Sequence, residues 1–293
     1  MLLQQLVNGL SLGAVYAVFA IGFTLVFGVM NVLNLSQGAV FMWGAYLGLE
    51  AVRTLALPLP VAILVALVGA GVLGVLSEVI VFRPLQRRGA HRWMGMVGSL
   101  ALARILIGIA QETFGMQVVR YPDNALAGAA FDILGARLQL LQIVAIGAAL
   151  AMMIALAVLL RLTNLGRAIR TVAFSETVAR LVGVPVDRVR LATFFVSGAM
   201  AGGAGVLWSL LFQSVSPFMG EGILLKGLTV LILGGLGNVV GALAGGLLLG
   251  LVEVASVVAV GSGYRDAVGF GLVLIILVTR PTGLFATREV KRA

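Results

Sequence analysis

Long apolar stretches separated by short polar segments make up almost the whole chain. Most of them approach the roughly 20 residues that an α-helix needs to cross the hydrocarbon core of a bilayer. The pattern therefore predicts an all-α, polytopic membrane helix bundle, with eight or nine transmembrane or re-entrant helices in a single transmembrane domain over 1–293. The apolar runs are 5–29, 37–53, 58–82, 94–114, 139–160, 191–214, 223–236, 239–260 and 266–280.

Two of these runs, 223–236 and 266–280, are short for a membrane crossing, so one pair of segments is expected to be broken or re-entrant. Polar residues also interrupt the pattern at Asn34, Ser36 and Gln37. Ser36 is suited to cap a helix that begins at Gln37. Two interpretations remain open: an interfacial loop before a capped helix, or a break whose polar groups line a passage.

A second interruption is the glycine-rich turn from Gly234 to Asn238. It breaks an apolar run near membrane depth, where irregular backbone is tolerated if it is buried in protein or lines a water-filled cavity. The turn is therefore a candidate for the wall of a translocation path, together with Asn34, Ser36 and Gln37. The residues of the turn that carry this expectation are Gly234, Gly235, Gly237 and Asn238.

Composition strengthens the membrane assignment. The chain is 61% hydrophobic and 11% charged, whereas soluble domains carry about 25% charged residues. Glycine contributes 39 residues, and small residues allow helices to approach closely in lipid. Pairs of glycines four residues apart, Gly198 with Gly202, Gly241 with Gly245 and Gly246 with Gly250, predict either close helix packing or hinges that move during gating.

The net charge of +9 is concentrated in three basic clusters between apolar runs. Because short loops rich in Lys and Arg stay in the cytoplasm, 161–190 is expected to be a cytoplasmic loop and 115–138 an extracytoplasmic one. The N-terminus would then lie outside and the C-terminus inside. The positions of the basic residues therefore indicate the topology, and they give no reason to expect a nucleic-acid partner. The clusters are Arg83, Arg87, Arg88 and Arg92; Arg161, Arg167, Arg170, Arg180, Arg188 and Arg190; and Arg280, Arg288, Lys291 and Arg292.

Enzyme chemistry has little support in the sequence. There is no cysteine, and His91 is the one histidine, so no catalytic residue, metal site or cofactor is expected. A phosphate-binding G-x-x-x-x-G-K-[ST] loop is also missing. Arg104 and Glu253 lie deep in apolar runs and could pair or face a cavity. Three other acidic residues, Glu50, Glu78 and Glu112, fall near predicted helix ends, where interfacial water solvates them.

One short helix is predicted inside the 161–190 loop. Ser175 is a good N-cap, Glu176 suits the positive end of the helix dipole, Gly183 is a good stop, and Pro185 prevents continuation. So short a helix is unstable alone, and Val178, Leu181 and Val182 give it an apolar side. It is expected to dock on the membrane face of the protein, on lipid headgroups, or in a groove of a cytoplasmic partner.

Four passages of the chain resemble the permease subunits of branched-chain amino-acid ABC importers: Asn8–Ala39, Gly166–Gly205, Lys226–Gly250 and Arg280–Phe285. The order and spacing of the four are specific, and the likeness extends over nearly all of the chain. It implies that 1–293 is a permease domain of a bacterial inner membrane. One departure is Gln37, which stands where relatives usually have histidine.

The resemblance also implies roles and partners. The helix from Ser175 to Gly183 would be the coupling helix that engages cytoplasmic ATPase subunits. The chain would form half of the path with a second permease, related or identical, and a periplasmic solute-binding protein would deliver the substrate. The coupling residues would be Ser175, Glu176, Val178, Ala179, Arg180, Leu181 and Gly183.

Other functions remain compatible with the sequence. A permease of the same family could carry urea or short amides. The protein could be an ion-coupled secondary carrier, in which Arg104 or Glu253 would be essential for transport. It could also be a passive channel, in which transport would not depend on ATP. The carrier and the channel leave the capped helix without a role.

Overall fold

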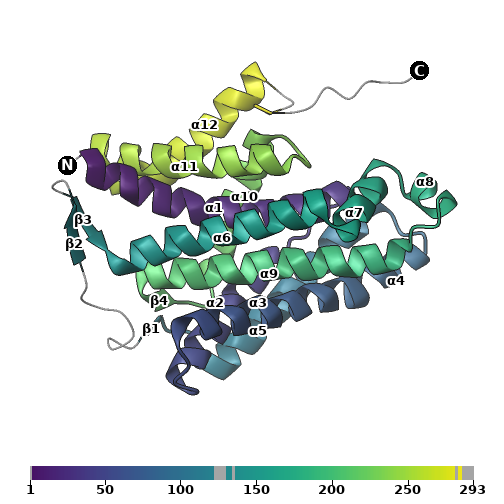
Figure 1. Cartoon of the computed structure of the whole chain (residues 1–293), viewed down its shortest axis with the longest axis horizontal. Helices are drawn as coiled ribbons and strands as arrows, with labels where there is room; N and C mark the ends of the chain where they lie inside the picture. The colour runs from purple at the N-terminus through teal and green to yellow at the C-terminus, as the bar shows by residue number, and fades with distance from the viewer. Residues whose placement is uncertain (1, 122–129, 134–135, 281–282, 286–293) are drawn as a thin grey trace.

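The computed structural model describes residues 2–121, 130–133, 136–280 and 283–285. Its long helices lie side by side in one elongated bundle, and the last helix is tilted away from the others (Figure 1). The first half contains α1 (Leu2–Met30), α2 (Gln37–Arg53), α3 (Leu59–Ser77), the π-helix η1 (Glu78–Phe82), α4 (Arg83–Arg87) and α5 (Arg92–Phe114). The second half contains α6 (Leu140–Leu162), α7 (Asn164–Phe174), α8 (Glu176–Leu181), α9 (Val186–Phe212), α10 (Met219–Gly234), α11 (Val239–Ala259), the 3-10 helix η2 (Ser262–Tyr264) and α12 (Arg265–Thr279).

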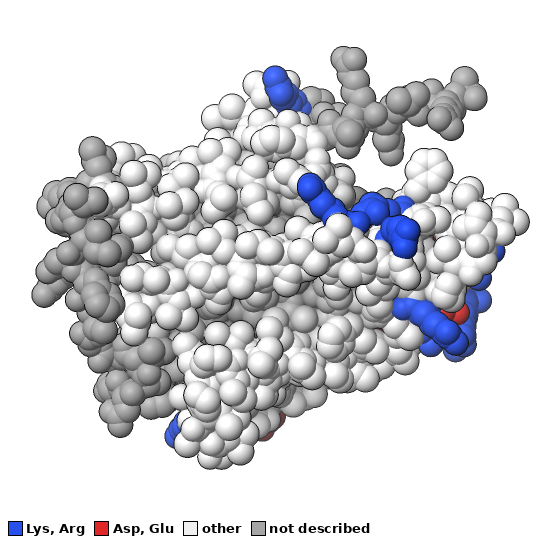
Figure 2. Space-filling model, viewed as in Figure 1, with Lys and Arg blue, Asp and Glu red and all other residues white. Residues whose placement is uncertain are grey.

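The two ends of the bundle differ in chemistry. One end carries α4, α7 and α8, and Lys and Arg gather there in the space-filling view (Figure 2). We call it the arginine end. The opposite end carries two short antiparallel sheets, β1 (Val119–Arg120) with β4 (Ser214–Val215) and β2 (Ala130–Ile133) with β3 (Ala136–Gln139). We call it the hairpin end. The face drawn in Figure 2 is almost free of charged residues between these ends, as a lipid-facing surface must be.

Seven helical segments in the described part of the chain are long and apolar enough to cross a membrane. The shorter helices α2 and α10 add 17 and 16 residues, so the expected all-α bundle with eight or nine transmembrane or re-entrant helices is confirmed. The chain is thus a multi-pass membrane protein. The seven segments are Leu3–Met30, Leu59–Arg87, Trp93–Phe114, Leu140–Leu162, Val186–Phe212, Val239–Ala259 and Ser262–Thr279.

The two halves of the bundle repeat the same packing in opposite directions. Helices α1 and α9 are mostly buried, and they run antiparallel through the centre (Figure 1). Each is followed directly by a non-glycine residue with φ of 50°, Asn31 after α1 and Gln213 after α9. The next helices begin at Gln37 and Met219 respectively. In one half, the central helix α1 packs on α11. In the other half, the central helix α9 packs on α3. The short helices α2 and α10 therefore occupy equivalent places, and they meet at Gly38 and Gly220.

Glycine allows the central helices to approach closely, as expected from the glycine pairs. A Cβ atom on Gly246 of α11 would lie 2.5 Å from the backbone nitrogen of Ala17 on α1. On Gly250 it would lie 2.4 Å from Gly13, and on Gly198 it would lie 2.4 Å from the Ala70 carbonyl oxygen. Such contacts leave no room for a side chain, so close packing accounts for these spacings.

Gly246→Leu is therefore expected to destabilise the bundle by about 1–3 kcal/mol or more, because the new side chain has to push α1 away from α11. Gly147→Leu is the matched control, since nothing lies within 4 Å of a Cβ at Gly147 on α6. Intrinsic tryptophan fluorescence during heating in detergent measures both. Equal melting temperatures for the two variants would contradict the packing argument.

Several local features differ from the sequence-based expectation. The 161–190 segment holds α7 as well as α8, and α9 begins inside it at Val186. Glu78 is not an interfacial residue, because its side chain is buried in η1 beside Arg83. Parts of the 115–138 segment and the basic residues Arg288, Lys291 and Arg292 lie outside the described residues.

Candidate functional site

The short helix α8 at the arginine end begins and ends as its sequence indicates. The Ser175 hydroxyl oxygen accepts a hydrogen bond from the Val178 N–H at 3.3 Å, which satisfies one free donor of the first turn. Gly183 has φ of 79°, a conformation that glycine adopts without strain. Pro185 then precedes α9. Capping and a glycine stop thus confine α8 to Glu176–Leu181.

The two sides of α8 face different surroundings. Ala179 is fully buried in a small core with Ile169, Val172, Val186 and Val189. It cannot belong to an exposed contact surface, which corrects its assignment to the contact face. Exposed apolar residues at the end of α7, on α8 and directly after α8 form what we call the apolar patch: Phe174, Val178, Leu181 and Val182. Phe174 and Leu181 are 81% and 82% exposed, so the patch projects from the charged end of the bundle.

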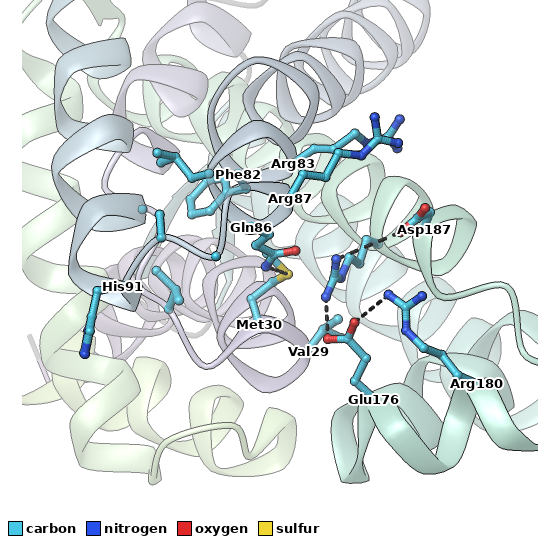
Figure 3. Close-up of a pocket in the computed structure, with 16 residues that line it drawn as sticks. Val29, Met30, Phe82, Arg83, Gln86, Arg87, His91, Glu176, Arg180 and Asp187 are labelled. Carbon is cyan, nitrogen blue, oxygen red and sulfur yellow. Dashed lines mark hydrogen bonds and ion pairs between the residues drawn. The ribbon is translucent and has the colours of Figure 1, made fainter.

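Glu176 links α8 to the long central helix α9. Its carboxylate accepts hydrogen bonds from Arg180 at 2.8 Å and from Arg190 of α9 at 2.5 Å, and Figure 3 shows Glu176 turned toward Arg180. Burial raises the pKa of the Glu176 carboxyl group, but the hydrogen bond from Arg180 and the charge of Arg190 outweigh it and lower the pKa. The ion pair therefore stabilises the fold at neutral pH, and this stabilisation is lost as the pH falls through the lowered pKa.

A cavity of about 530 Å³ opens beside this ion pair (Figure 3). Its wall combines the end of α1 at Val29 and Met30 with η1, α4, α8 and the start of α9. Cationic side chains outnumber acidic ones along it. The charged lining residues are Arg83, Arg87, Arg180, Arg190, Glu176 and Asp187. Asn34, Ser36 and Gln37 do not line this cavity.

The three polar residues of the first break lie inside the bundle and hold the start of α2. The Asn34 side-chain oxygen accepts from the Ser36 N–H at 3.2 Å and from the Ser36 hydroxyl at 2.6 Å. Ser36 occupies the N-cap position but makes no side-chain cap, which corrects the expected capping role. Gln37 donates from Nε2 to the Ser197 carbonyl and hydroxyl oxygens, both at 3.0 Å. Ser197 in turn donates to the Gly22 carbonyl oxygen at 2.7 Å, so α1, α2 and α9 are tied together here.

The Gly234–Asn238 turn lies elsewhere, where α10 turns back into α11. Asn238 caps α11 by accepting from the N–H groups of Val240 and Gly241, each at 3.0 Å. Its side-chain amide donates to the Phe285 carbonyl oxygen at 2.6 Å. Gly235 and Gly237 have φ of 94° and 82°, and Gly234 packs directly on Gly241. The turn is thus a packed junction with the C-terminal segment.

A charge cluster centred on the buried residues Glu253 and Lys226 joins four helices that the sequence did not bring together. Glu253 of α11, with no exposed surface, accepts from Tyr16 and Arg265, both at 2.8 Å, and pairs with Lys226. Lys226 also pairs with Asp266 at 2.7 Å. The positive charges of Lys226 and Arg265 thus balance the negative charges of Glu253 and Asp266. Glu253 is therefore not the partner of Arg104, as had been considered.

Arg104 instead pairs with Glu221. Its Nη1 atom lies 2.5 Å from the Glu221 carboxylate in the first turn of α10. The two residues are 117 positions apart, and Glu221 was not among the candidate residues. The interruption before α10 was the signal that could have drawn attention to it.

Comparison with known proteins decides the family. The family model for the permease component of branched-chain amino acid transport systems matches residues 5–278. The chain belongs to this family. It is thus a membrane transport component, as the sequence analysis expected.

Several known transport permeases resemble the chain over most of its length. The high-affinity branched-chain amino acid transport system permease protein LivH of Salmonella typhimurium is 31% identical, over 99% of this chain and 97% of that protein. BraD of Pseudomonas aeruginosa is also 31% identical with the same coverage. The ribose import permease protein RbsC of Haemophilus influenzae is 27% identical, over 94% and 84%.

A solved structure shows the same fold at greater distance. A chain of PsaBC from Streptococcus pneumoniae in complex with Fab has a TM-score of 0.50 and 15% identity, and covers 92% of this chain and 90% of its own length. The family assignment therefore rests on the sequence comparisons, and the solved structure adds only a shared fold.

Proposed function

We propose that this chain forms half of the translocation path of an ATP-driven importer for branched-chain or related hydrophobic amino acids in a bacterial inner membrane. The names of LivH and BraD support this substrate class. The chain would pair with itself or with a related permease. A periplasmic solute-binding protein would deliver substrate at the hairpin end, and cytoplasmic ATPase subunits would bind at the arginine end.

The arginine end is assigned to the cytoplasm because Lys and Arg gather there. Since α1 begins at the opposite end (Figure 1), the N-terminus would lie outside. The C-terminus would lie in the cytoplasm, because α12 runs from the outer side inward. This orientation places α7, α8 and the apolar patch in water.

The apolar patch is the observation that carries the ATPase proposal. The four apolar side chains of the patch project from the most charged end of the protein, where water makes their exposure unfavourable. The underside of α8 is fixed by Ala179. A groove on an ATPase subunit would cover the patch, as amphipathic helices are bound in partner grooves. The coupling residues would then be Ser175, Glu176, Val178, Leu181 and Gly183, with Phe174 and Val182 added. Ala179, which is buried, and Arg180, which is paired with Glu176 of the same helix, would only support α8.

Leu181→Asp tests the proposal. A charge at the centre of the patch is expected to weaken binding of the ATPase subunits about tenfold or more. ATP-dependent leucine uptake by reconstituted vesicles should fall in parallel. Copurification of the ATPase with the tagged permease from its native membranes measures binding directly.

Val260→Asp serves as the control, because Val260 is an exposed apolar residue near the hairpin end. It should leave binding of the ATPase subunits unchanged, because it lies at the opposite end of the protein. If Leu181→Asp behaves like Val260→Asp, the patch does not bind the ATPase. Uptake that follows a proton gradient and ignores ATP would instead indicate a secondary carrier.

A further inference from the structure

The ion pair between Arg104 and Glu221 occupies an unusual place for charged groups. Arg104 lies near the middle of α5, a helix of 23 residues, so both helix ends are more than 10 Å away at a rise of about 1.5 Å per residue. Yet the side chains are 64% and 45% exposed. Lys226 and Glu253, the charged groups deep in α10 and α11, are buried by contrast.

Lipid is an unsuitable neighbour for this pair. A charged side chain at the centre of a bilayer costs about 3 kcal/mol by insertion measurements and more in other estimates. The two charges offset each other in part, but their exposed polar atoms would still lack hydrogen-bond partners in hydrocarbon. This surface therefore faces water or polar groups at mid-membrane depth.

The surroundings of the pair leave room for a small ligand. Gly108 lies one turn after Arg104, and Gly222 directly follows Glu221. A Cβ atom at either glycine would meet nothing within 4 Å. Exposed apolar side chains flank the charges, with Leu100 one turn before Arg104 and Leu225 one turn after Glu221. A positive group, a negative group, open space and apolar neighbours thus occur together.

We propose that Arg104 and Glu221 form a contact site for the zwitterionic head of an α-amino acid in the translocation path. The guanidinium group would bind the substrate carboxylate through paired N–H donors, and the Glu221 carboxylate would accept from the substrate ammonium group. The pair opens as the substrate enters, so every charge keeps a partner of opposite sign. Leu100 and Leu225 would contact the apolar side chain. The inference rests on the proposed function, since it names how that substrate is held.

Neutral variants test the contact. Arg104→Gln and Glu221→Gln are each expected to reduce leucine uptake about tenfold to hundredfold, the effect of losing a hydrogen bond to a charged group. Uptake is measured in vesicles that contain the complete transporter and the solute-binding protein. Copurification of the ATPase should stay at the wild-type level, which shows that the variants fold.

The exchanged pair, Arg104→Glu with Glu221→Arg, distinguishes substrate contact from a purely structural ion pair. A structural pair would be restored and uptake would recover, which would overturn the proposal. A substrate contact would not recover, because the carboxylate and ammonium groups would have to change places while the substrate side chain kept its position.

Cysteine labelling tests water access without disturbing the charges. The chain has no cysteine, so Gly108→Cys and Gly147→Cys each carry one thiol. Both glycines have open space, and both lie about two turns from the hairpin end of their helix. A charged methanethiosulfonate reagent should modify Gly108→Cys, more slowly during leucine transport, and should spare Gly147→Cys on α6.

Equal labelling of the two variants would overturn the proposal, and so would unchanged uptake in Arg104→Gln and Glu221→Gln. These failures differ from failure of the proposed function. If the proposed function were wrong, the wild-type complex itself would show no ATP-dependent transport of amino acids.

Discussion

Glu253→Gln is expected to destabilise the protein by about 3–5 kcal/mol, because it removes the buried counter-ion of Lys226, which is itself buried, and of Arg265, which is partly buried. Glu253 is fully buried and accepts from Tyr16 and Arg265 while it pairs with Lys226. These contacts join α1, α10, α11 and α12. The apparent melting temperature in detergent should fall by about 10 °C, and tryptophan fluorescence measures it.

Removing a positive charge together with Glu253 separates charge balance from packing. The double variant Glu253→Gln with Lys226→Met leaves Arg265 and Asp266, whose charges cancel. It should recover much of the lost stability, since replacing both partners of a buried pair costs far less than removing one. Glu112→Gln removes an exposed carboxylate and should have no effect. A double variant less stable than Glu253→Gln would show that hydrogen bonding, rather than charge balance, holds the cluster.

The apolar pattern predicted the helices well because each membrane crossing needs a minimum length of apolar sequence. The predicted run 37–53 coincides with α2, and 239–260 ends one residue beyond α11. Local signals also predicted α8, whose cap at Ser175 and stop at Gly183 are properties of adjacent residues. Helix α7 was missed because its arginines were read as a loop, although Leu165, Ile169 and Val172 follow a helical period.

Pairings between distant residues could not be predicted in this way. Arg104 and Glu253 were both recognised as deep charges, but their partners are set by which helices lie side by side. Glu221 pairs with Arg104 only because α10 starts inside the bundle after the interruption that follows Gln213. The burial of Ala179 likewise depends on how α8 rests on α7 and α9. Hydrophobic periodicity indicates which side chains face lipid, but it carries no information about which helices contact each other.

Arg190→Gln is expected to reduce ATP-driven uptake about thirtyfold or more while the ATPase stays bound. Arg190 is nearly buried on α9 and binds Glu176 of α8 at 2.5 Å, so this ion pair would transmit a movement of α8 to α9. The Glu176 side chain is 42% exposed, so the cost of losing this pair is that of a hydrogen bond to a charged group, about 1.5–3 kcal/mol. Seven residues further along α9, Ser197 binds Gln37 and Gly22, so motion of α9 would reach the start of α2.

Arg180→Gln is the matched control, because Arg180 donates to the same carboxylate at 2.8 Å but belongs to α8 and is exposed. Exposed pairs contribute little, and uptake should change less than about threefold. Arg190→Lys should restore part of the uptake, since it returns the charge without the paired donors. Equal effects of Arg180→Gln and Arg190→Gln would place the mechanical link elsewhere. A loss of ATPase binding in Arg190→Gln would mean that Arg190 holds the apolar patch in place instead of transmitting its motion, because the patch itself is unchanged in that variant.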